Sequence, residues 1–223
     1  MRNRARGKDV DPLRCRRCRL HTDLCACNLL TPIPVATKVL VVAHWAEVRK
    51  PTNTGGLATL CLQDAELCLR GREGLPNDPV IWDPASMPLF LFPDPGAIAI
   101  EGWRAANPDA RKVTLIVPDG TWRQAKRVRR RVPGLPDIQE VKLTAKSGSG
   151  YRLRHAHLEH RLATMEAIAQ ALGVLEGPAV EQHLMHAFHA VVDRTLWSNG
   201  RVRTRDVTGG IPDGARQDGP ASR

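Results

Sequence analysis

The chain has 223 residues, with 33 lysines and arginines against 23 acidic residues, which gives a formal net charge of +10. This length suits one compact domain, or one domain with a small appendage, and the charge favours a polyanionic partner over an acidic protein or a neutral metabolite alone. Three phenylalanines, one tyrosine and five tryptophans are too few for a broad stacking platform for single strands, so arginine contacts to phosphate should dominate.

The two ends of the chain are expected to lie outside the folded core. Residues 1–11 are basic and predict a flexible arm, and residues 205–223 are rich in glycine and proline and predict a disordered tail. No run is apolar enough for a secretory signal or a membrane span. The sequence therefore predicts a cytoplasmic protein, in which closely spaced cysteines indicate a metal site rather than disulfides.

Four cysteines lie within thirteen residues near the N-terminus, in the spacing Cys15-x2-Cys18 and Cys25-x-Cys27. Four thiolates can close a tetrahedral zinc site, and four protein ligands leave no open position for catalysis. Residues 12–30 are therefore predicted to form a knuckle around a structural zinc ion. The alternative, two reactive pairs or plain reduced thiols, would leave a segment too short to fold by itself.

Residues 31–204 predict an α/β domain with a largely parallel sheet. The predicted strands are 38–43, 89–92, 97–100, 113–117 and 138–143, and the predicted helices are 57–70, a basic helix from about 122, 158–172 and 180–197. Cys61 and Cys68 would share one face of the helix 57–70 and are expected in the core. Helices should cover both faces of such a sheet, and ligands should bind at loops that follow the carboxyl ends of strands.

Two loops at predicted strand ends carry candidate functional residues, namely Phe92-Pro-Asp-Pro-Gly96 and Pro118-Asp-Gly-Thr-Trp122. The second loop joins a strand to a helix, so Asp119 would lie at the strand end beside backbone amides. A tight turn with Thr121 as helix N-cap accounts for the same residues without any chemistry. The residues alone therefore leave Asp119 as either a catalytic carboxylate or a turn residue.

Read with other motifs of the chain, Asp119-Gly-Thr-Trp122 resembles the signature of the DTW-domain family. The other motifs are the cysteine quartet, His44-x-x-Glu47, Asn53-Thr-Gly55, Tyr151-Arg-Leu-Arg154 and Thr164-x-Glu166-Ala167. The resemblance covers roughly Cys15 to Trp197 and makes residues 31–204 the DTW catalytic domain. It implies a SPOUT-like fold with a C-terminal knot, and transfer of the 3-amino-3-carboxypropyl group of S-adenosylmethionine to N3 of a tRNA uridine.

This reaction needs a group that accepts the N3 proton of uridine while N3 attacks the methylene carbon of a sulfonium, and Asp119 is the candidate general base. The expected contacts of S-adenosylmethionine are Pro93, Pro118, Gly120, Thr121, Trp122, Arg154, Thr164 and Glu166. Trp122 either packs under the adenine or anchors its helix, and Glu166 either lines the pocket or caps a helix. Likewise, His44, Glu47 and Asn53 either touch substrate or serve the structure.

A run of positive charges follows the Asp119 loop. Arg123, Lys126, Arg127, Arg130 and Arg131 are expected to contact the tRNA backbone. A charge run of this kind is also typical of a solvated helix face. Two other functions fit the same sequence, namely a SPOUT-like RNA methyltransferase and a non-enzymatic zinc-knuckle protein that binds RNA.

Overall fold

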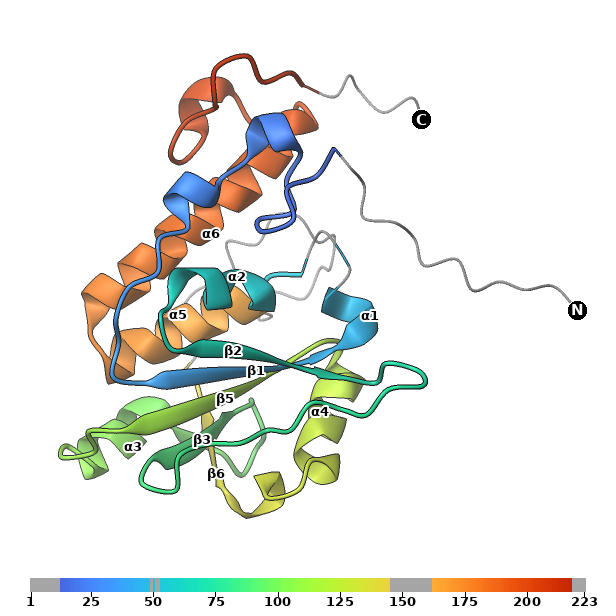
Figure 1. Ribbon diagram of the computed structural model, residues 1–223. Helices are drawn as coiled ribbons and strands as arrows, with labels where there is room; N and C mark the ends of the chain where they lie inside the picture. Colours follow the sequence, from blue (N-terminus) through green and yellow to red (C-terminus); the bar gives the residue numbers. More distant parts are fainter. Residues whose placement is uncertain (1–12, 49, 51–52, 145–161, 218–223) are drawn as a thin grey trace, which may run out of the picture.

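A single parallel sheet organises the fold (Figure 1), and the computed structural model describes residues 13–48, 50, 53–144 and 162–217. The strands within these residues are β1 (Lys38–His44), β2 (Ala65–Arg70), β3 (Met87–Leu91), β4 (Ile98–Ala99), β5 (Val113–Asp119) and β6 (Gln139–Lys142). They lie in the order β2-β1-β5-β3-β6-β4, and each neighbouring pair is parallel. The expected parallel sheet is confirmed, and all its strands end at one edge.

Helices cover both faces of the sheet, as expected for continuous apolar strands. They are α1 (Trp45–Val48), α2 (Gly55–Cys61), α3 (Ile100–Ala106), α4 (Trp122–Arg131), α5 (Thr164–Leu175) and α6 (Pro178–Ser198), with short 3-10 turns η1 (Thr22–Leu24), η2 (Cys27–Leu29), η3 (Leu135–Asp137) and η4 (Thr204–Asp206). Figure 1 shows α2, α5 and α6 on one side of the sheet and α4 on the other. The sheet is therefore buried between two helical layers.

The alternation of side chains along β1 explains why both faces need cover. Val39 and Val41 belong to the core shared with α2, α3, α5 and α6, whereas Leu40 and Val42 belong to the core under α4. All four side chains are fully buried. Because successive side chains of a strand point to opposite faces, an uninterrupted apolar run fits only a central strand of this kind.

The predicted helix 57–70 is wrong in its second half. Helix α2 ends at Cys61, and Ala65–Arg70 forms strand β2, which pairs with β1 in parallel. Leu67 and Leu69 pack toward one core while Cys68 between them is buried in the other. Their spacing of two residues is that of a strand, and pairing along β1 outweighs the helical spacing of the two cysteines.

Two other predicted elements are shorter than expected. The strand expected over 97–100 is the two-residue β4, and Ile100 already begins α3. The helix expected over 158–172 begins at Thr164 in the described residues. Residues 158–161 lie outside the described part, as does the whole connection 145–161 between β6 and α5. The expected C-terminal knot stays a prediction.

The C-terminal segment differs from the expected disordered tail. Residues 204–217 pack against α6, where Val207 is buried and the Thr208 hydroxyl donates to Asp193 Oδ2 at 2.7 Å. Glycines in this stretch provide left-handed turns, with φ of +69° at Gly209 and +70° at Gly210, so they fold the segment back. Residues 1–12 and 218–223 lie outside the described part, and the predicted arm over 1–11 is among them.

The N-terminal segment lies along α6 rather than forming a body of its own (Figure 1). Leu20, Leu24 and Leu30 are buried in the same core as Leu184 and Phe188 of α6. The boundary drawn at residue 30 between knuckle and catalytic domain stays a prediction. Among the described residues, no helix is both long and apolar enough to span a membrane.

Candidate functional site

Asp119 is the last residue of β5 and is buried, with 6% of its surface exposed. Both carboxylate oxygens accept hydrogen bonds from other parts of the chain. Thr164 Oγ1, at the start of α5, donates to Oδ1 at 2.5 Å, and the Asn53 side-chain amide donates to Oδ2. The carboxylate thus joins three segments at the carboxyl edge of the sheet, and we call Asn53, Gly55, Asp119 and Thr164 the Asp119 cradle.

Asn53 and Gly55 are shaped to fit this carboxylate. The Asn53 side-chain oxygen Oδ1 accepts the Gly56 N–H at 3.2 Å, which leaves the side-chain NH2 directed at Asp119. A Cβ atom at Gly55 would lie 2.8 Å from both Cγ and Oδ2 of Asp119. Since real Cβ atoms do not approach so closely, glycine at position 55 lets α2 begin directly against the carboxylate. The sequence left open whether Asn53 touches substrate or has a structural role. In the structure its side chain contacts Asp119.

Some of the residues expected to contact S-adenosylmethionine form helix caps or turns in the structure. Thr121 caps α4, because its hydroxyl accepts the Gln124 N–H at 3.3 Å while Gln124 Oε1 accepts the Thr121 N–H at 2.7 Å. Glu166 is 2% exposed and accepts the Ala163 N–H at 2.7 Å at the start of α5. Gly120 has φ of +152°, which favours glycine. These turns hold Asp119 and Thr164 in register.

The two predicted loops lie next to each other at the sheet edge. β3 and β5 are paired, and the Phe92 ring after β3 packs on the Trp122 ring with centroids 5.5 Å apart. Trp122 remains 43% exposed, and Pro93 is exposed beside it. Pro118 lies half-buried one residue before Asp119. The structure therefore gathers both loops around the strand ends, whereas Arg154 lies outside the described residues.

His44 ends β1 at the same edge and Glu47 follows in α1, but both have structural partners. His44 Nδ1 accepts the Ala46 N–H at 3.2 Å, and the ring lies against Gly71, where a Cβ would come within 2.5 Å of Nε2. Glu47 is buried and pairs with Lys50 at 2.7 Å. Their described contacts agree with the structural alternative, although Ala43 is paired with Asp119 in the sheet.

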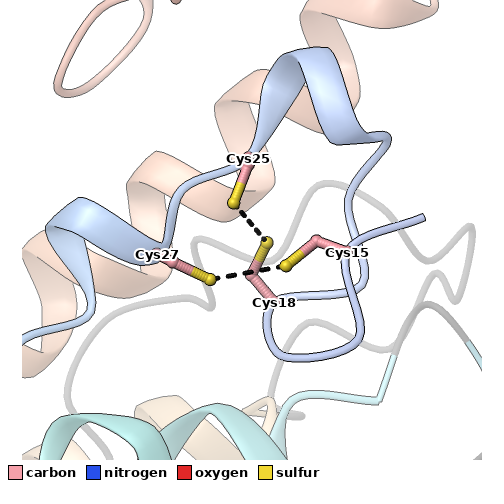
Figure 2. A group of neighbouring side chains, drawn as sticks. All are labelled: Cys15, Cys18, Cys25 and Cys27. Carbon is pink, nitrogen blue, oxygen red and sulfur yellow. Dashed lines mark hydrogen bonds between the residues drawn. The ribbon is translucent and has the colours of Figure 1, made fainter. Parts of the chain in front are cut away.

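The four N-terminal cysteines form one cluster (Figure 2), with all sulfur atoms within 4.8 Å of one another. The Sγ atoms are 3.5 Å apart for Cys15 and Cys27 and 3.8 Å apart for Cys18 and Cys25. Four sulfurs at about 2.3 Å from a tetrahedral zinc ion would be roughly 3.8 Å apart, so the cluster fits zinc closely. Residues from both sides of the 3-10 turn η1 supply these thiols.

The environment acts differently on the thiols of the cluster, because burial raises the pKa of Cys18 and of Cys27 but the pKa of Cys15 is lowered. Desolvation acts to raise the pKa of Cys15, but backbone N–H groups of Cys18 and Arg17 and the Cys27 thiol lower it to about 6. Burial raises the pKa of Cys61 to about 12 and raises that of Cys68. Both are core residues as expected, although they lie on opposite faces of the sheet instead of on one helix. Their thiols are therefore unsuited to reactivity.

Helix α4 carries an exposed basic face directly after the Asp119 loop. The side chains of Arg123, Lys126, Arg127, Arg130 and Arg131 are all exposed, and we call these five residues the basic face. Three of them, Arg127, Arg130 and Arg131, line a surface hollow of about 340 Å³. Arg129 differs, because it pairs with Glu140 and donates to Leu135 O at 2.9 Å. That arginine fixes the helix to η3 and β6.

Sequence reasoning missed Arg194, a buried residue of α6. Its guanidinium donates to Cys25 O at 2.6 Å and to Gly210 O at 3.0 Å. It therefore connects the cysteine segment with the C-terminal segment. An arginine inside a helix that reads as apolar is a signal that could have marked it, because such a charge needs buried partners.

Comparison with known proteins gives relatives over most of the chain. The tRNA-uridine aminocarboxypropyltransferase 2 of Drosophila melanogaster is 29% identical over 199 residues, which span 85% of this chain and 77% of that protein. The proteins of the same name from Macaca fascicularis and Mus musculus are 28% and 27% identical over 85% of this chain, which spans 65% of each of them.

One solved structure resembles the fold more remotely. The SAM-dependent rRNA:acp-transferase Tsr3 from Vulcanisaeta distributa matches with a TM-score of 0.44 and 16% sequence identity, over 78% of this chain and 85% of that one. The family comparison is more extensive, because the family model for the DTW domain matches residues 12–196. This match includes the cysteine cluster, the Asp119 cradle and most of α6, and the chain belongs to the DTW-domain family.

Proposed function

We propose that this protein transfers the 3-amino-3-carboxypropyl group of S-adenosylmethionine to N3 of a uridine in tRNA. The observation that carries the proposal is the Asp119 cradle, a buried carboxylate at the carboxyl edge of the sheet beside an exposed basic helix. Its relatives are named for this transfer to tRNA uridine. Because its relatives are named for the modification of tRNA, we also propose that the protein works in the cytoplasm.

The residues at the sheet edge suit such a cofactor. The first turn of α4 brings backbone amides and the positive end of the helix dipole, which favour the methionyl carboxylate. The half-exposed Trp122 ring, supported by Phe92, offers an apolar surface for the adenine. When bound, S-adenosylmethionine supplies an alkyl group activated by its sulfonium.

In this proposal Asp119 accepts the proton of uridine N3 as N3 attacks. An ionised carboxylate has about four acceptor positions, so the bonds from Asn53 and Thr164 leave room for a third donor. Those two donors also prevent the carboxylate from rotating, which keeps its acceptor direction fixed. The proton leaves N3 for an Asp119 oxygen while the N3–carbon bond forms and the carbon–sulfur bond breaks.

A positioning role for Asp119 competes with this one and uses the same contacts. In that role the carboxylate, which is 6% exposed, takes no proton and simply holds α2, β5 and α5 together around the cofactor. The two roles differ in a measurable way, because a positioning residue would affect cofactor affinity whereas a base would affect turnover alone. The basic face next to the loop would bind the tRNA backbone in either case.

The experiment that tests the proposal is transfer to tRNA by the purified, metal-containing protein. Unmodified tRNA is incubated with S-adenosylmethionine, and its nucleosides are analysed by mass spectrometry. A uridine heavier by the aminocarboxypropyl group, with methylthioadenosine as coproduct, is the expected result. A methylated nucleoside with S-adenosylhomocysteine would instead identify a methyltransferase, and bound but unmodified tRNA would identify a binding protein.

A further inference from the structure

Arg194 is a buried cation whose partners are unusual. Its side chain is 2% exposed, and it forms no ion pair with a carboxylate in the part of the chain that the structure describes. The guanidinium donates to four backbone carbonyl oxygens instead, at 2.6 Å (Cys25), 3.0 Å (Gly210), 3.3 Å (Gly209) and 3.4 Å (Leu24). Carbonyl dipoles stabilise a buried cation only in part, so the described carboxylates leave the charge of Arg194 without full compensation.

The cysteine cluster can supply that charge. Among the titratable groups of the described residues, the thiols of Cys18 and Cys25 are the ones that interact with Arg194 electrostatically. As neutral thiols they would contribute no charge. Four thiolates around one Zn²⁺ carry a net charge of about −2, and metal binding is what keeps such thiols deprotonated. A metal-bound cluster is therefore the state in which the buried guanidinium is balanced.

The same part of α6 also holds the C-terminal segment. Asp193 Oδ2 accepts the Thr208 N–H at 3.1 Å and the Thr208 hydroxyl at 2.7 Å. The next two carbonyls, of Gly209 and Gly210, are those that accept from Arg194. The backbone at Gly209 is also pressed against the cysteine segment, since a Cβ there would lie 2.4 Å from Leu29 Cδ1. Loss of the charge balance at Arg194 would thus weaken the contacts of both the cysteine segment and the C-terminal segment.

We propose that Arg194 is the counter-cation of the metal-thiolate cluster and that, through it, metal binding is coupled to the docking of residues 204–217 on α6. The coupling is reciprocal, since two events that stabilise the same guanidinium position must favour each other equally. The C-terminal segment is therefore part of the metal site's supporting structure. This role is independent of the reaction at the Asp119 cradle.

Substitutions at Arg194 test the counter-charge. Arg194→Met should lower zinc affinity by about 10- to 100-fold, the usual loss for a residue that supports metal ligands, as measured by competition with a chelating dye. Arg194→Lys retains the charge and should lie between Met and wild type. Arg129→Met is the matched control, because Arg129 also donates to carbonyls at 2.9 Å, 3.0 Å and 3.2 Å but far along the chain from the cysteines. Equal zinc affinities of the Met and Lys variants, or a loss no larger than that of the control, would overturn the proposal.

Metal removal from the wild-type chain tests the coupling without any substitution. After a chelator strips the zinc, hydrogen exchange should accelerate at the amides of Thr208 and Gly210 as well as in residues 13–30, and added zinc should reverse it. Exchange in the strands beside Asp119 should stay slow. A C-terminal segment that remains protected in the metal-free protein would disprove the coupling, even if Arg194→Met did not fold.

Discussion

The Asp119 cradle and the basic face of α4 are neighbours in the chain but differ in every physical respect. The cradle holds one buried carboxylate through hydrogen bonds from two distant segments, at Asn53 and Thr164, and through the close approach of Gly55. The basic face presents five exposed cations from a single helix, with no fixed partner required for their effect. The first arrangement determines the geometry at one atom, and the second attracts a polyanion over a wide area. Substitutions should therefore separate turnover from RNA affinity.

The largest effect is expected from Asp119→Asn, which keeps the size and turn-forming ability of the side chain but removes its proton acceptor. Turnover should fall by roughly 10²–10⁴-fold, as is typical when a positioned general base is lost, while cofactor affinity survives. Single-turnover rates and S-adenosylmethionine affinity are measured on the same variant. Asp94→Asn, in the neighbouring loop, is the control.

Three outcomes of this measurement have different meanings. A rate loss with unchanged cofactor affinity supports the base. A rate loss together with weaker cofactor binding would assign Asp119 the positioning role. Near-wild-type turnover would remove Asp119 from the mechanism and leave it as a turn residue.

Reversal of three charges on the basic face, at Arg127, Arg130 and Arg131 to Glu, should weaken tRNA binding without affecting S-adenosylmethionine. If each arginine contacts one phosphate, the slope of log affinity against log salt should become shallower by about 3. Filter binding across a salt series gives this slope. The control reverses Arg201, Arg203 and Arg205, which changes the net charge equally at exposed positions after α6. Indistinguishable slopes for the two triple variants would make the face a merely solvated one.

The smallest effect should come from Thr164→Val, which preserves side-chain shape but deletes one donor to Asp119. A hydrogen bond to a charged acceptor contributes about 1.5–3 kcal/mol, so turnover should fall at least about tenfold. Thr164→Ser keeps the hydroxyl and should restore most of the rate, and single-turnover kinetics at saturating cofactor compare the two. A valine variant as fast as wild type would show that this bond serves folding alone.

The sequence predicted contiguous features well and distant contacts poorly. The cysteine cluster could be predicted because its four ligands lie in one short segment, so spacing alone limits their distances. The cradle could not, because Asn53 and Thr164 reach Asp119 across 66 and 45 residues, and periodicity carries no information about such contacts. Family resemblance named these motifs without giving their mutual arrangement.

The elements that were predicted wrongly share one cause: their structure depends on contacts with distant segments of the chain. Ala65–Arg70 forms a strand because β1 offers a free edge, and residues 204–217 are ordered because α6 offers Asp193 and Arg194. Local composition favoured a helix in the first case and disorder in the second. In both, contacts formed only in the folded chain outweighed local preference.

The order of the strands also bears on how the molecule forms. β5 lies between β1 and β3, both of which precede it in the chain, and β6 likewise lies between β3 and β4. During synthesis the earlier strands must wait for their central partners, which makes folding slow and leaves apolar edges exposed in the meantime. Asp119 ends the strand that joins the two halves of the sheet. The carboxylate is thus placed when the two halves of the sheet join, but its cradle is complete only after Thr164 and α5 have been synthesised.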